Sequence, residues 1–142
     1  MKKTLRILLS CGGTVVMLMA LAANAIAAES TLSRQDRQGP VTVTATLVPS
    51  VTADGPLRVK VALDTHSVNL DDLAFETIVA FRAPDGSDVE PAAIEQAKGG
   101  GHHRETVVVF PAPGASGGLR VVVKNVGGVG ERIFTWELPA SR

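Results

Sequence analysis

The chain has 142 residues, of which 14 are basic and 14 acidic, so it carries no formal net charge at pH 7. Three of the basic residues, Lys2, Lys3 and Arg6, lie at the very start, and the chain without them has 11 basic residues against 14 acidic ones. The resulting net charge of about −3 argues against nucleic acid and anionic membrane surfaces as partners, because both attract basic patches.

The first 27 residues have the pattern of a secretory signal peptide. Residues 1–6 form a short basic region with Lys2, Lys3 and Arg6, and an apolar run follows over residues 7–22. The small residues Ala25 and Ala27 predict cleavage after Ala27, with cleavage after Ala25 or Ala28 as alternatives. An uncleaved membrane anchor and lipidation at Cys11 are the alternatives. The pattern indicates a Sec-type signal and a bacterial protein of the periplasm or the medium, without membrane contact after cleavage. Because the only cysteine and all three methionines precede this site, the processed chain has no disulfide and no sulfur ligand for a metal.

Alternating hydrophobicity predicts strands through most of the remaining chain. Residues 41–48 place valine, alanine and leucine on one face and threonine on the other, and residues 57–64 alternate in the same way. Residues 28–40 are polar and predict a flexible lead-in, so we expect a single domain over residues 41–142. Further strands are expected over residues 74–82, 105–110, 119–126 and 131–138, with a short helical turn or a weak edge strand over residues 89–96.

The number and spacing of these elements predict the fold class. Turn residues such as Pro84-Asp85-Gly86 separate the strands, and Gly127-Gly128 is expected to join the last two strands as a hairpin. About seven strands without a convincing helix favour an all-β antiparallel β-sandwich of immunoglobulin or fibronectin-like type, with a small β-barrel as the alternative. The cysteine–tryptophan–cysteine spacing of immunoglobulins is absent, so the likeness is one of architecture alone.

Two of the three histidines follow a run of three glycines at residues 99–101. Consecutive glycines predict a loop, because glycine loses more backbone entropy on folding than any other residue. This loop would carry His102 and His103 to the start of an apolar strand. The third histidine, His66, follows Asp64 in the other conspicuously polar segment. We therefore expect any site to lie where these two segments meet.

These side chains are of the types that bind metals. Asp64, His66, His102 and His103 could ligate zinc, copper(II) or nickel, although none of their spacings is a recognised ligand motif. On extended backbone, His102 and His103 would point to opposite faces. In the alternative interpretation, one histidine hydrogen-bonds loop backbone or an aspartate and the other is solvated.

Charged residues near the same loop are candidates for ligand binding, namely Arg104, Glu105, Asp71 and Asp72. Arg104 and Glu105 are neighbours on the predicted strand and should therefore lean to opposite faces. We expect Arg104 to pair with Asp64, Asp71 or Asp72 across the corner, as a structural ion pair or as part of a ligand site.

The sequence does not support hydrolase chemistry. Residues 114–118 match G-x-S-x-G, but that motif needs a following helix and a later aspartate and histidine. Here a strand is expected to follow, and neither residue type occurs after Ser116. Residues 127–130 are rich in glycine but lack the strand–loop–helix context of a phosphate-binding loop. We therefore expect no enzymatic activity.

Two sequence phrases, that is, short segments, resemble small exported bacterial proteins of unassigned function. They are Leu63-Asp64-Thr65-His66-Ser67 and Gly100-Gly101-His102-His103-Arg104-Glu105. The resemblance covers about residues 57–138 and implies no activity, only that the two phrases belong together on an all-β domain. We therefore expect a non-enzymatic binding or accessory module whose partner is another envelope protein. The alternative is a periplasmic metal-binding protein in which the three histidines hold zinc, copper(II) or nickel.

Overall fold

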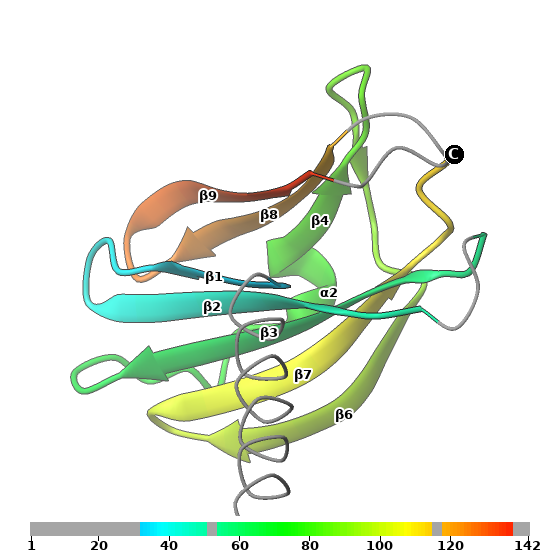
Figure 1. Cartoon of the computed structure of the whole chain (residues 1–142). Coiled ribbons are helices and arrows are strands. Elements are labelled where there is room, and N and C mark those ends of the chain that lie inside the picture. Colours follow the sequence, from blue (N-terminus) through cyan, green and yellow to red (C-terminus); the bar gives the residue numbers. More distant parts are fainter. Residues whose placement is uncertain (1–31, 51–53, 115–117, 138–142) are drawn as a thin grey trace, which may run out of the picture. The chain divides into compact units, whose positions relative to one another are not determined.

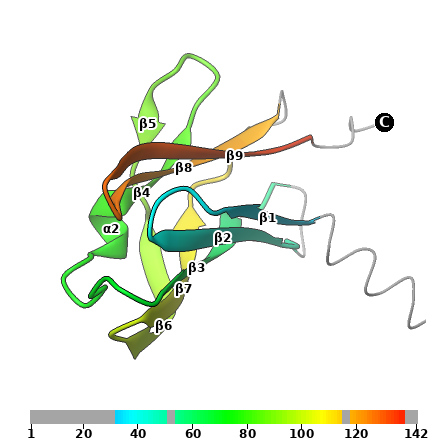
Figure 2. The ribbon, with the colours of Figure 1, turned by 90° about the vertical axis from the view of Figure 1, so that its left-hand side faces the viewer.

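A computed structural model describes residues 32–50, 54–114 and 118–137, which belong to one compact unit that begins at Leu32. They form two antiparallel sheets that face each other (Figures 1 and 2). The five-stranded sheet has the order β1-β2-β3-β7-β6, and the four-stranded sheet has the order β5-β4-β8-β9. The elements are β1 (Ser33–Asp36), β2 (Val41–Val48), β3 (Leu57–Thr65), α2 (Phe75–Ile78), β4 (Val79–Arg82), β5 (Asp88–Val89), β6 (Ala93–Gly100), β7 (His103–Phe110), β8 (Leu119–Val126) and β9 (Val129–Trp136).

The all-β sandwich predicted from the sequence is confirmed. Within the described residues the strands form two separate sheets rather than one closed barrel, and they number nine rather than about seven. The two additional strands, β1 and β5, are four and two residues long. Strands this short do not produce a recognisable alternation of apolar and polar residues.

The core lies between the sheets and follows the alternation of the sequence. On β2 and β3, Val43 pairs with Leu63 and Ala45 with Val61, and all four side chains are fully buried. Burying a valine or leucine side chain in this way contributes about 1.5–3 kcal/mol. The opposite sheet adds Val79, Phe81, Leu119, Val121, Val123, Phe134 and Trp136 to the same core.

The flexible lead-in predicted over residues 28–40 is wrong for the part that the structure describes. β1 pairs with β2, and Ser33 Oγ lies 3.0 Å from Thr46 Oγ1 across the two strands. The sheet therefore begins before residue 41, and β2 is an inner strand. A strand with polar side chains on both faces has no hydrophobic alternation, so it cannot be recognised from the sequence and is seen only when its partner strand is known.

The strand predicted over residues 74–82 begins instead with a helical turn. In α2 the amide of Ile78 donates to the carbonyl of Ala74 at 3.1 Å, and the strand β4 starts only at Val79. Phe75 and Ile78 are both buried, and a spacing of three residues places them on one face of a helical turn. None of the helical segments in the described ranges is long and apolar enough to cross a membrane.

The three glycines at residues 99–101 do not all lie in a loop. The first two end β6, and only the third forms the turn together with His102. A Cβ at Gly99 would lie 2.2 Å from the carbonyl oxygen of His103, so β6 and β7 approach each other here more closely than a side chain would allow. The ambiguous segment at residues 89–96 forms no helical turn: Val89 ends β5 in the other sheet, and residues 93–96 begin the edge strand β6.

Candidate functional site

The end of β3 and the start of β7 bring the two histidine-bearing segments together. Asp64 pairs with His103 in the strand register, and the amide of Thr65 donates to the carbonyl of His102 at 3.0 Å. An open cavity of about 390 Å³ lies at this junction and is lined by Pro40, Thr42, Asp64, Thr65, His66, His102 and His103. We call these seven residues the histidine corner.

His103 and Asp64 are in direct contact within the histidine corner. His103 Nδ1 lies 2.5 Å from Asp64 Oδ1, and the two side chains are 53% and 51% exposed. The other ring nitrogen, Nε2, lies 4.0 Å from Glu105 Oε2. A carboxylate on one imidazole nitrogen fixes the orientation of the ring and leaves the second nitrogen to face a ligand.

His102 lies in the turn rather than on extended backbone, so it does not alternate with His103 as extended residues would. Its Nδ1 atom lies 3.2 Å from the carbonyl oxygen of Val68. A carbonyl only accepts hydrogen bonds, so Nδ1 carries the proton in this contact. His66 is exposed and lines the same cavity, and the structure thus brings all three histidines of the chain to one place.

The four predicted metal ligands share this cavity without forming a ready metal site. Among residues 32–50, 54–114 and 118–137, no three histidine, cysteine or carboxylate side chains form a group that could hold a metal ion. Instead, one histidine ring contacts loop backbone and another contacts Asp64. As they stand, these side chains suit a hydrogen-bonding ligand better than a metal ion.

Arg104 supports the loop after β3 instead of forming the predicted ion pair with an aspartate. Its Nη1 atom donates to the carbonyls of Leu70 and Leu73, at 2.7 and 2.5 Å, and its guanidinium lies 5.0 Å from the centre of the Phe75 ring. Arg104 lies on the inner face of β7, whereas Asp64 lies on the outer face of β3. The strand register thus separates the two side chains, and the arginine stabilises loop backbone.

Asp71 also acts on the backbone of this loop. Its Oδ1 atom accepts a hydrogen bond from the amide of Gly101 at 2.7 Å, and the amide of Leu70 donates to the Gly101 carbonyl at 2.9 Å. Asp72 is exposed in the same loop, outside the cavity lining. These contacts join the loop after β3 to the β6–β7 turn, and so hold the two halves of the histidine corner together.

Glu105 belongs to a charge cluster on the outer face of the sheet rather than to the cavity lining. It is 8% exposed and forms ion pairs with Lys60 and Lys98, at 2.9 and 2.6 Å. Hydrogen bonds from Lys98 and Lys60 lower the pKa of Glu105 to about 2. The carboxylate is therefore charged over the whole neutral range and ties β3, β7 and β6 together.

The sequence analysis missed a buried arginine beside the turn between β1 and β2. Arg132 is 1% exposed, and its guanidinium donates to Asp36 and to the carbonyls of Val126, Gln38 and Val41. Burial alone would raise the pKa of Asp36, but hydrogen bonds from Gln38 and Arg132 hold it below its usual value. The signal in the sequence is a charged residue at an inward position of a strand whose next two inward residues, Phe134 and Trp136, are aromatic.

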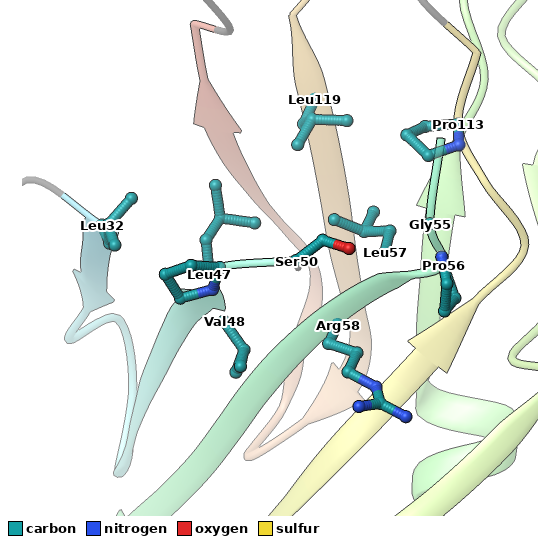
Figure 3. A pocket seen from close by; sticks show the side chains of 11 residues that line it. Leu32, Leu47, Val48, Ser50, Gly55, Pro56, Leu57, Arg58, Pro113 and Leu119 are labelled. Carbon is teal, nitrogen blue, oxygen red and sulfur yellow. The ribbon is translucent and has the colours of Figure 1, made fainter. Parts of the chain in front are cut away.

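It also missed an apolar cavity of about 230 Å³ at the other end of β3 (Figure 3). Leu47 and Leu57 from one sheet and Leu119 from the other converge there, and Pro56 and Pro113 border it. Its lining offers few hydrogen-bonding groups, so only apolar groups could occupy it favourably. Leucines at strand ends next to prolines are the signal that could have indicated it.

Comparison with protein-family models, with curated proteins and with solved structures finds no match to this chain. The resemblance of its histidine-bearing phrases to small exported bacterial proteins stays a prediction. A sandwich fold by itself hosts many unrelated functions, so the function has to be argued from the geometry of the histidine corner.

Proposed function

We propose that this chain is an exported, non-enzymatic binding module and that its ligand binds at the histidine corner. The observation that carries the proposal is the cavity itself, where three imidazoles and one carboxylate from separate segments face the same space. Three of these side chains are held by hydrogen bonds, and Arg104 and Asp71 hold the loop behind them. A site whose side chains are fixed before binding pays less entropy when it binds.

The chemistry of the corner favours a polar group on another envelope protein as the ligand. Its imidazoles and carboxylate can donate and accept hydrogen bonds, and the cavity is open enough to admit a side chain that projects from a partner's surface. The histidine ring contacts described above are to a carbonyl and to a carboxylate, and neither is a hydroxyl that an imidazole base could activate. This supports a binding role rather than catalysis.

Photo-crosslinking in the producing cell tests this proposal. A photoreactive amino acid in place of His66 should give a discrete covalent adduct with one envelope protein, which mass spectrometry identifies. The same amino acid in place of Gln35 is the matched control, because Gln35 is also exposed but lies on β1, outside the cavity lining. Adducts of equal yield at both positions, or none at His66, would contradict binding at the corner.

Binding of a divalent transition metal is the second candidate. It is favoured by the gathering of all three histidines and Asp64 around one cavity, where His66 and His102 are exposed and could turn their rings toward an ion. Asp64 behind Nδ1 of His103 is the carboxylate–histidine arrangement that often supports a metal ligand through its Nε2 atom.

Isothermal titration of the processed protein with zinc, copper(II) and nickel tests the metal candidate. Saturable binding at a dissociation constant of about a micromolar or tighter, lost in the His102→Ala/His103→Ala variant, would support it. An absence of binding, or binding that the variant retains, would exclude the metal site. Neither result bears on the proposed binding of a partner protein, which the crosslinking experiment tests separately.

A further inference from the structure

The two sheets have four edge strands, and three of them are poor templates for another strand. β1 and β5 are only four and two residues long. β6 is eight residues long but contains an irregularity between Glu95 and Lys98, where Gln96 has a φ of 53°. Short strands, bulges and lysines are common protections against edge-to-edge pairing.

The fourth edge strand, β9, lacks these protections. It is eight residues long and keeps a single register with β8, with one irregular position near the turn, where Asn125 of β8 has a φ of 54°. It also carries Ile133, which at 51% exposure is the one large hydrophobic residue of the described chain that is exposed. Its inward arginine, Arg132, is buried and fully engaged with Asp36 and backbone carbonyls, so it places no charge at the edge.

The turn before β9 determines which of its backbone groups face outward. Gly127 and Gly128 have φ values of 60° and 78°, which are typical of a two-residue type I′ hairpin. The pair that closes such a hairpin, Val126 with Val129, is hydrogen-bonded, and hydrogen-bonded pairs then alternate along the strands. The amides and carbonyls of Arg132 and Phe134 therefore point away from β8, toward the free edge.

We propose that β9 pairs antiparallel with β9 of a second copy of this chain, centred on Ile133. In this register Arg132 and Phe134 exchange backbone hydrogen bonds with Phe134 and Arg132 of the second copy. The two Ile133 side chains then face each other as a non-hydrogen-bonded pair, with Cα atoms about 4.5 Å apart. Centring the pair on Glu131 instead would set two like charges directly opposite each other, which is unfavourable.

The charges beside Ile133 are complementary in this register. Thr135 would face Glu131 of the second copy, and Arg120 lies next to Thr135 on β8. Arg120 is half-buried and makes no ion pair with a residue that the structure describes, so it can reach across the short threonine toward that glutamate. Glu131 also pairs with Arg82 of its own chain at 2.6 Å, so Arg120 would add a second positive partner to it. A two-fold axis repeats the contact in both directions and closes the dimer without leading to a filament.

Sedimentation velocity of the processed full chain over a range of concentrations tests this association. We expect a reversible monomer–dimer equilibrium in the wild type. Ile133→Lys would place two lysines face to face and should raise the dimer dissociation constant about tenfold or more. Ala93→Lys is the matched control, since Ala93 is exposed on the outer face of the other long edge strand, and it should leave the dissociation constant unchanged. Thermal melts establish that both variants fold.

Cysteine crosslinking tests the register. Cys11 is the only cysteine of the chain, so Cys11→Ser/Ile133→Cys carries a single thiol that should form an interchain disulfide rapidly on mild oxidation. Cys11→Ser/Ala93→Cys should link much more slowly. A wild type that stays monomeric at all concentrations, or equal linking rates at the two positions, would overturn the proposal.

Discussion

Replacing Arg132 by methionine should destabilise the domain strongly, although methionine fills a similar volume. The guanidinium makes four hydrogen bonds, to Asp36 at 3.0 Å and to the carbonyls of Val126, Gln38 and Val41 at 2.8, 2.6 and 3.2 Å. Methionine supplies no donor for any of them. The carbonyls at the buried ends of β2 and β8 and the Asp36 carboxylate would then lose their partner.

The size of the effect follows from how much of this network water can reach. A buried acceptor left without a donor costs about 1–3 kcal/mol, and breaking a buried ion pair from one side costs about 3–5 kcal/mol. Asp36 keeps 21% of its side chain exposed, so water recovers part of its loss. We therefore expect Arg132→Met to lower the free energy of unfolding by about 3–5 kcal/mol, a large share of the 5–15 kcal/mol typical of a domain.

Equilibrium urea unfolding of the wild type and of Arg132→Met measures this change. Arg37→Met is the matched control, because Arg37 is exposed near the same turn, and it should change the free energy of unfolding by less than about 0.5 kcal/mol. Asp36→Asn, which keeps the shape of the side chain but removes its charge, should cost less than Arg132→Met. A loss below about 1 kcal/mol for Arg132→Met would refute the assignment of Arg132 as a structural donor, since that is the net worth of one ordinary hydrogen bond.

Three further substitutions have defined outcomes. The folded-state pKa of Glu105 is about 2 against an ordinary 4.5, so the stability that its carboxylate contributes to the fold is complete above pH 4.5 and declines as the pH falls toward 2. Glu105→Gln should therefore flatten the pH dependence of the free energy of unfolding in that interval, and an unchanged slope would contradict the ion-pair cluster. Arg104→Met should speed amide hydrogen exchange in the loop after β3 more than in β8, and uniform exchange would contradict its local role. Gly127→Asn would bring a Cβ within 2.8 Å of Val41 Cγ2 and should lower the free energy of unfolding by about 1–3 kcal/mol. Gly128→Asn is the control, because a Cβ there would have nothing within 4 Å, and it should lower the melting temperature far less. Equal thermal shifts for the two variants would refute the steric argument.

The sequence predicted the location of the candidate site better than its geometry. Because His66 follows one predicted strand and His102 and His103 precede another, pairing of these strands places the three histidines at one end of the sandwich. The roles of the surrounding charges were not predictable in this way. Arg104 binds loop carbonyls and Glu105 pairs with two lysines because their neighbours depend on strand register and on the path of the loop.

By itself the sequence determined the all-β class, most of the strands and the final hairpin. Alternation along a strand reports directly which face meets water, and adjacent glycines report a left-handed turn, so both signals are local. Only the tertiary structure decided that residues 33–36 form a strand and that Arg132 is buried. Arg132 meets Asp36 from 96 positions away along the chain, and β1 exists because β2 offers it an edge. Polar groups gain their stability from partners distant in sequence, and no local pattern records which partners they find.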